Sequence, residues 1–386
     1  MTAMKNKNTT TTNGNTTPQI VQTQAALTQV AARLRVARRI GVDTESNSMY
    51  AYRERVCLIQ ISIPGVDYLL DPLALHDLSI LGPIFADPEI EKIFHAADYD
   101  LMVLRRDFKF HCKHLFDTMW AARVLGWPHV GLGDILERYF DVEVNKRYQR
   151  YDWGQRPLDP QALAYAWRDS HYLLALRDIQ AAELKERGRW AEAQEIFTYL
   201  CENVTLPHSK NKMLYFWRIK GVNKLSASEK ALLYRLYCWR ERKAKQLDYP
   251  PARFINNQRL LQLTRIQPRT IQDLRRAGLS RQQAQRFGKE ILQALRSNPK
   301  RYPRRLTPSP RQPREVMDRY YALKAWRKEV AARRGVDSDV ILPNAVLQEL
   351  ADNPPRTLDD LLEISGIGPW RQQAYGPDIL KLLEEN

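Results

Sequence analysis

Cysteine and long apolar runs are both scarce in this sequence of 386 residues. Its 4 cysteines, at positions 57, 112, 201 and 238, form no Cys-x-x-Cys pair, which argues against a disulfide framework and favours a reducing compartment. No apolar run approaches the roughly 20 residues needed to cross a bilayer, and the Thr- and Asn-rich N-terminus has no apolar signal core. We therefore expect a soluble, cytoplasmic protein.

Acidic and basic residues are separated along the chain. Residues 1–200 hold 24 Lys and Arg against 25 Asp and Glu, whereas residues 201–386 hold 36 against 19, a net charge of +17. A basic half of this size predicts a surface that binds a polyanion; the alternative is a solvated basic face without a partner. At this length we expect two or three domains.

The first half of the chain has the pattern of a mixed α/β domain. Residues 1–18, rich in Thr, Asn and Lys, predict a disordered tail. Short links, one of them with Pro64-Gly65, favour an antiparallel meander of strands at 40–45, 56–63 and 68–71. The other segments predict a strand at 90–95 and helices at 22–35, 75–85, 99–106, 118–125, 132–140 and 160–187. We expect a domain over residues 19–206 in which helices flank a mixed sheet.

Beyond residue 207 the strand pattern ends and two small all-α bundles are predicted, at 210–297 and 314–386. The Pro- and Arg-rich stretch 298–313 between them predicts an extended linker. The bundles look like distant repeats, because Trp239-Arg240 in one corresponds to Trp326-Arg327 in the other, and each ends on Gly-containing turns before a closing helix.

Two carboxylates on the first of the predicted strands are the first candidates for chemistry. Asp43 and Glu45 occupy alternate positions of Arg39-Ile-Gly-Val-Asp-Thr-Glu-Ser46, so their side chains point to the same face of the strand. Two like charges so close resist ionisation unless a cation lies between them. A divalent metal ion is the simplest source of that positive charge, although such carboxylate pairs also occur on solvated sheet faces.

Further carboxylates follow where a later strand meets a helix and on the last helix of the domain. In His95-Ala-Ala-Asp98-Tyr-Asp100 either aspartate could be a ligand; Asp98 is also a plausible helix N-cap, so we favour Asp100. Tyr165 and Asp169 are four residues apart, hence on one helical face. Taken alone, a core Tyr beside a solvated Asp is the commoner explanation of this spacing.

Asp-x-Glu, the later Asp and Tyr-x-x-x-Asp, in this order, resemble the DEDD-type 3′-5′ exonucleases of the tyrosine subgroup. The run Lys146-Arg-Tyr-Gln-Arg-Tyr-Asp-Trp-Gly-Gln-Arg-Pro-Leu158 resembles ribonuclease D, as does the order of this domain before two bundles similar to helicase-and-RNase-D C-terminal (HRDC) domains. The resemblance implies an RNase H-like fold and release of nucleoside 5′-monophosphates from RNA 3′ ends. It further implies action on tRNA precursors and other small structured RNAs, and we expect the protein to be a monomer.

Four converging carboxylates, Asp43, Glu45, Asp100 and Asp169, can hold two Mg²⁺ or Mn²⁺ ions about 3.5–4 Å apart. One ion would deprotonate the attacking water and the other would stabilise the departing 3′ oxygen. Tyr165, with an ordinary pKa near 10, is a poor base at neutral pH, so we assign it to positioning the water.

The candidates for binding nucleic acid are basic residues near the third motif and in the bundles, with solvated charge as the alternative: Lys146, Arg150, Arg156, Arg240, Arg327 and Arg371. Gly366 and Gly368 could let backbone N–H groups meet a phosphate, or form a plain turn. The pattern His111-Cys112-Lys-His114 lacks a second ligand pair, which argues against zinc. Two rival functions stay open: a DNA exonuclease with the same chemistry, and a catalytically inactive RNA-binding scaffold.

Overall fold

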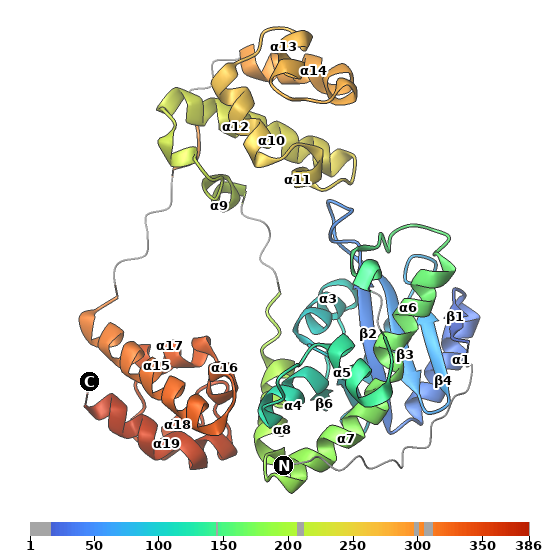
Figure 1. Ribbon diagram of the computed structural model, residues 1–386, viewed down its shortest axis with the longest axis vertical. Helices are drawn as coiled ribbons and strands as arrows, with labels where there is room; N and C mark the ends of the chain where they lie inside the picture. The colour runs from blue at the N-terminus through green and yellow to red at the C-terminus, as the bar shows by residue number, and fades with distance from the viewer. Residues whose placement is uncertain (1–16, 144–145, 207–211, 297–300, 305–311, 386) are drawn as a thin grey trace.

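The computed structural model describes residues 17–143, 146–206, 212–296, 301–304 and 312–385, which form an α/β domain and two helical bundles (Figure 1). Most of the predicted tail (1–18) and of the predicted linker (298–313) lies outside these residues. No helix in the described part of the chain is long and apolar enough to span a bilayer.

The α/β domain is built on a six-stranded mixed sheet in the order β1-β4-β3-β2-β5-β6. The antiparallel meander is confirmed, because β3 pairs antiparallel with both β2 and β4, whereas β5 joins β2, and β6 joins β5, in parallel. Two strands of three residues were not predicted, β1 and β6. The strands are β1 (Gln19–Val21), β2 (Arg39–Ser46), β3 (Val56–Ile63), β4 (Val66–Leu70), β5 (Glu91–Phe94) and β6 (Leu115–Asp117).

Helices flank this sheet on both faces (Figure 1). The predictions at 118–125 and 132–140 are confirmed, but the one at 160–187 is wrong in continuity because the helix breaks at Tyr172. The helix predicted at 75–85 begins later than expected, at Ser79, because Asp77 accepts the N–H of Ser79 and starts the helical segment there. The helices are α1 (Gln24–Arg35), α2 (Gly82–Ala86), α3 (Asp98–Phe108), α4 (Thr118–Leu125), α5 (Leu132–Phe140), α6 (Pro160–His171), α7 (Leu173–Glu186) and α8 (Trp190–Glu202).

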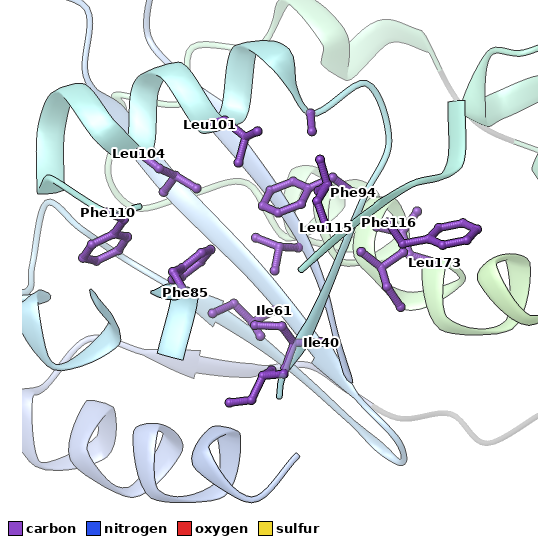
Figure 2. Close-up of a cluster of buried hydrophobic side chains, with 14 of the residues drawn as sticks. Ile40, Ile61, Phe85, Phe94, Leu101, Leu104, Phe110, Leu115, Phe116 and Leu173 are labelled. Atoms are coloured by element: carbon purple, nitrogen blue, oxygen red, sulfur yellow. The ribbon is translucent and has the colours of Figure 1, made fainter. Parts of the chain in front are cut away.

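The two faces of the sheet bury different side chains. On one face Ile40 and Ile61 join a large apolar core with Phe85, Leu101 and Leu104, from α2 and α3 (Figure 2). The opposite face packs under α6, where Leu58 and Leu69 meet the small side chains of Ala162 and Ala166. Alternation along β2 therefore directs Val42 into the main core and Asp43 and Glu45 towards α6.

The two bundles are repeats of one fold. In the first, the buried Arg240 donates to the carbonyl of Ile255 (2.9 Å) and to Asn257 Oδ1 (2.8 Å). In the second, the buried Arg327 makes the same two bonds to residues 342 and 344, at the same sequence spacing. The helices are α9 (Lys212–Trp217), α10 (Ala227–Gln246), α11 (Pro251–Phe254), α12 (Asn257–Ile266), α13 (Ile271–Arg276) and α14 (Arg281–Arg296), then α15 (Arg314–Arg334), α16 (Ser338–Ile341), α17 (Asn344–Asp352), α18 (Leu358–Leu361) and α19 (Pro369–Glu384).

The bundles contact the α/β domain in different ways. The β2–β3 loop reaches towards α11 (Figure 1), and its backbone N–H groups at Tyr52 and Arg53 donate to Asp248 of the first bundle. The second bundle instead pairs Arg334 with Glu192 of α8, at 2.6 Å, where the Glu192 side chain is 0% exposed. The second bundle is thus held by a buried ion pair, the first by an exposed loop contact.

Candidate active site

A cleft of about 460 Å³ opens on the α6 side of the sheet, above β2. The close approach of α6 to β2 depends on Gly41, because a Cβ there would lie 2.7 Å from the carbonyl oxygen of Ser170. This contact brings the end of α6 down onto the strand that carries the first two acids. The cleft is lined by Asp43, Thr44, Glu45, His95, Gly131, Leu132, Gly133, Asp134, Gln149, Tyr165 and Asp169.

Three of the predicted acids meet in this cleft. Asp43, Glu45 and Asp169 each offer a carboxylate oxygen, and these oxygens all lie within 4.8 Å of one another. Asp43 and Glu45 come from alternate positions of β2, and Asp169 comes from α6, more than a hundred residues later. Among the described residues this is the one group of three or more metal-ligating side chains close enough to share an ion.

The structure separates the two candidates in the second motif. Asp100 is 7% exposed and accepts a hydrogen bond from the hydroxyl of Thr44, and its charge acts on Asp43 and Glu45. Asp98 is exposed and is the first residue of α3 rather than its N-cap. The side chain beside the cluster is therefore that of Asp100.

Burial and mutual repulsion make these acids hard to ionise. Burial, then the charges of Asp100 and Asp169, raise the pKa of Asp43 well above its usual range. Burial raises the pKa of Asp100 and of Asp169 to about 7. None of these acids, nor Glu45, forms an ion pair with a described residue. A site with this excess of negative charge has the composition that a divalent cation requires.

Tyr165 lies one helical turn before Asp169 and donates its hydroxyl to that carboxylate. Burial, followed by the negative charges of Asp169 and Glu45, raises the pKa of Tyr165 above its ordinary value. The phenol therefore keeps its proton at neutral pH and can act only as a hydrogen-bonding group. Hard carboxylate oxygens with a phenol donor beside them fit Mg²⁺ or Mn²⁺ better than a softer metal.

The comparisons with known proteins agree with this geometry. A family model described as 3′-5′ exonuclease matches residues 18–185, and the HRDC domain model matches residues 229–295 and 317–383. Protein RRP6-like 3 of Arabidopsis thaliana is 33% identical over 277 residues, 66% of this chain. The catalytic core of RRP6 from Trypanosoma brucei is similar at 25% identity with a TM-score of 0.64, over 73% of this chain and 79% of that one.

Residues 18–185 thus form a 3′-5′ exonuclease domain, and two HRDC domains follow it in the chain. Escherichia coli RNase D itself, 24% identical, shares the fold over 96% of this chain and 99% of its own, with a TM-score of 0.63. The curated relatives are longer: the match to RRP6-like 3 covers 31% of that protein, so this chain spans about a third of its length.

Several basic residues predicted to bind nucleic acid are structural instead. Arg156 binds both carboxylate oxygens of Asp71, at 2.7 and 2.6 Å, and the carbonyl of Cys57 at 2.8 Å. These bonds fasten the loop after the 3₁₀ turn Lys146–Arg150 to the sheet. Because its guanidinium is already saturated with partners, the prediction that Arg156 binds phosphate is wrong.

The arginines predicted in the bundles are corrected for the same reason. Arg240 and Arg327 are 5% and 6% exposed and bind carbonyls of their own bundles. Arg371 is 1% exposed, donates to the carbonyls of Ile341 and Val340 and pairs with Glu195. None of the three presents its guanidinium to solvent.

Glu195 also occupies the place predicted for a phosphate. It accepts the N–H groups of Trp370 and Arg371 at the start of α19. A Cβ at Gly368 would lie 2.5 Å from its carboxylate, so this glycine allows the close approach. The glycines therefore receive a protein carboxylate from α8 and not a nucleic acid.

Of the other candidates, Arg150 is exposed and the side chain of Lys146 lies outside the described residues. His114 binds the carbonyl of Pro88, and no zinc-like cluster forms around it among the described residues. The structure adds three residues that sequence reasoning missed: Thr44, which bonds Asp100, and Gln149 and His95, which line the cleft. Gln149 lay inside the run that carried the family resemblance, which was the available signal.

Proposed function

We propose that this chain is a metal-dependent 3′-5′ exoribonuclease that releases nucleoside 5′-monophosphates one at a time. The observation that carries the proposal is the convergence of carboxylate oxygens of Asp43, Glu45 and Asp169 within 4.8 Å, without an ion pair to a described residue. Asp43, Glu45, Asp100 and Asp169 would hold two divalent ions. Bound there, such ions would lower the pKa of an attacking water and stabilise charge on the departing 3′ oxygen.

The protein side chains have separate tasks in this scheme. Tyr165 keeps its proton and orients the attacking water by hydrogen bonding, while its contact with Asp169 fixes that carboxylate. Thr44 points to the face of β2 opposite Asp43 and Glu45, and its hydroxyl fixes the carboxylate of Asp100 by a hydrogen bond. Held carboxylates place the reacting groups in line, which is the main protein contribution to phosphoryl transfer.

The charge of the first bundle supports an RNA substrate larger than the cleft. Residues 212–296 hold 20 Lys and Arg against 5 Asp and Glu, whereas residues 312–385 hold 10 against 13. The first bundle therefore supplies the sequence-independent affinity for phosphates, and the second bundle is a structural partner of the exonuclease domain. We propose small structured RNAs, tRNA precursors among them, as substrates.

The proposal is tested with a tRNA precursor labelled at its 3′ or at its 5′ end, and with single-stranded DNA of matched length. With Mg²⁺ or Mn²⁺, the 3′ label should be released as mononucleotide at once and the 5′ label only at the end. EDTA or Asp43→Ala should abolish release, while RNA binding stays near wild type. Release from DNA alone, or activity of the Asp43→Ala variant equal to wild type, would contradict the proposal.

The role of the first bundle is tested by neutralising exposed residues. Changing Arg242, Lys245 and Arg275 to Gln should weaken RNA binding at low salt and reduce the salt slope by about 1 for each phosphate that the variant no longer neutralises. The matched control changes Lys324, Lys328 and Arg333 of the second bundle, and should leave both quantities unchanged. Equal losses in the two triple variants would refute the division of labour.

A further inference from the structure

A buried polar side chain next to the acid cluster has no partner. Gln60 lies in the middle of β3 and is 0% exposed. Neither its Nε2 nor its Oε1 has a hydrogen-bond partner among the described residues. Because leaving a buried amide unpaired destabilises a protein, a glutamine at this position calls for an explanation.

The register of the sheet places Gln60 beside the first acid. It is paired across the strands with Asp43 of β2 on one side and with Leu69 of β4 on the other. Directly opposed residues of an antiparallel pair point to the same face, with Cβ atoms about 4.5–5.5 Å apart. The amide of Gln60 therefore lies under α6, within side-chain reach of the Asp43 carboxylate.

The neighbouring polar residue on the same face of β3 is satisfied. Ser62, two positions along, lies 2.8 Å from the hydroxyl of Ser170 on α6. The space under α6 therefore does accommodate paired polar groups. In the cluster under α6, the indole Nε1 of Trp153 likewise has no partner among the described residues, but Gln60 is the one directly opposed to an acid of the site.

Asp43, in turn, lacks a side chain among the described residues that donates a hydrogen bond to it. Asp100 receives the hydroxyl of Thr44, and Asp169 receives the hydroxyl of Tyr165. For Asp43, by contrast, the described residues supply only a backbone bond, at Thr44. An unused amide donor and a carboxylate without a side-chain donor thus lie side by side on paired positions.

We infer that Gln60 is a positioning residue for Asp43, donating its Nε2–H to that carboxylate when the carboxylate is ionised and holds a cation. The inference rests on the proposed function, since it assigns a partner to one of the proposed ligands. Carboxylates that bind metal are themselves usually held by hydrogen bonds, and losing such a partner typically costs 10–100-fold in metal affinity. The cost of the unpaired amide in the metal-free protein is then the counterpart of tighter binding in the loaded one.

The test compares Gln60→Met, which keeps the length and removes the donor, with the wild type. Titration calorimetry should show Mn²⁺ affinity lower by about 10–100-fold. Thermal unfolding in EDTA should show a melting temperature equal to or above that of the wild type, because an unpaired amide has been removed. Gln60→Leu, which has similar volume, serves as a second variant and should behave in the same way.

Gln180→Met is the matched control. Gln180 is also 0% exposed, but its Nε2 donates to the carbonyl of Thr118 at 2.8 Å, and only its Oε1 lacks a partner among the described residues. This variant should melt at a lower temperature and bind Mn²⁺ as the wild type does. The pair separates a positioning role from a merely structural one.

Three results would overturn the inference. Wild-type Mn²⁺ affinity in both Gln60 variants would show that Asp43 does not depend on the amide. A lower melting temperature of both variants in EDTA would show that the amide already has a partner, such as an internal water molecule. If the wild type binds no Mn²⁺, the proposed function fails together with the inference, whereas the first two results leave the proposed function intact.

Discussion

Two groups of acidic residues in the exonuclease domain differ in whether an arginine of the chain compensates their charge. On α8, the Glu192 side chain is 0% exposed and that of Glu195 is 11% exposed, and each is paired with an arginine of the second bundle, Arg334 or Arg371. In the cleft Asp43, Glu45 and Asp169, and beside it Asp100, form no ion pair with a described residue, although the charge of Arg168 acts on Asp169. A buried carboxylate is stable as an ion only with a cation beside it. The first group obtains its cation from the chain, and the second is left to obtain one from solution.

The largest expected effect comes from removing the cation of a paired acid. Arg334→Met leaves Glu192 buried and uncompensated, and it should lower the free energy of unfolding by roughly 3–5 kcal/mol. Urea denaturation at neutral pH measures this. The double variant Glu192→Gln with Arg334→Met should recover much of the loss. A loss below about 1 kcal/mol, the usual value for a surface pair, would break the comparison.

Neutralising an unpaired acid should instead raise the free energy of unfolding. In the metal-free protein the pKa of Asp169 is raised to about 7 by burial, against an ordinary value of 3.8. The folded state therefore holds more protons than the unfolded state between those two values, and this group's contribution to stability is lost as pH rises through about 7. Asp169→Asn removes the penalty, and in EDTA at pH 8 it should stabilise the protein by roughly 2–4 kcal/mol.

The same variant also has a distinctive pH dependence. The gain in stability should shrink towards zero near pH 4, where the wild-type carboxyl is also neutral. The variant should lose release of mononucleotides, although it is the more stable protein. Denaturation in EDTA at several pH values measures the first effect. A loss of stability at pH 8 would show that Asp169 has a cationic partner.

The parts of the site that could be predicted from sequence are those set by local periodicity. Alternation on a strand places Asp43 and Glu45 on one face, and the helical repeat places Tyr165 above Asp169. The residue types suggested that Asp98 could be the N-cap of α3. The choice of Asp100 over Asp98 as the metal ligand depended on that suggestion. Gln60 was visible as one polar residue within Val-Cys-Leu-Ile-Gln-Ile-Ser-Ile, but its lack of a partner is a tertiary property.

The predictions that failed depended on long-range partners. Arg240 and Arg327 looked like surface charge, yet their partners are carbonyls 15 residues further along the chain. Gly368 looked like a phosphate site because the anion that fills it, Glu195, lies 175 residues before Trp370 on a helix that was not predicted. That helix, α8, buries Ala193, Ile196, Phe197 and Leu200 at helical spacing, so its amphipathic pattern was available. The sequence did not indicate which basic residues of the second bundle would lie opposite this helix.

The most direct test of the shared cation site is titration of Mn²⁺ into the matched pair Asp98→Asn and Asp100→Asn at pH 8. Both variants remove one carboxylate from the start of α3, but only the side chain of Asp100 lies beside the cluster. We predict wild-type Mn²⁺ affinity for Asp98→Asn and a loss of at least about tenfold for Asp100→Asn. Equal affinities for the two variants, or a loss confined to Asp98→Asn, would contradict a cation site built on Asp100.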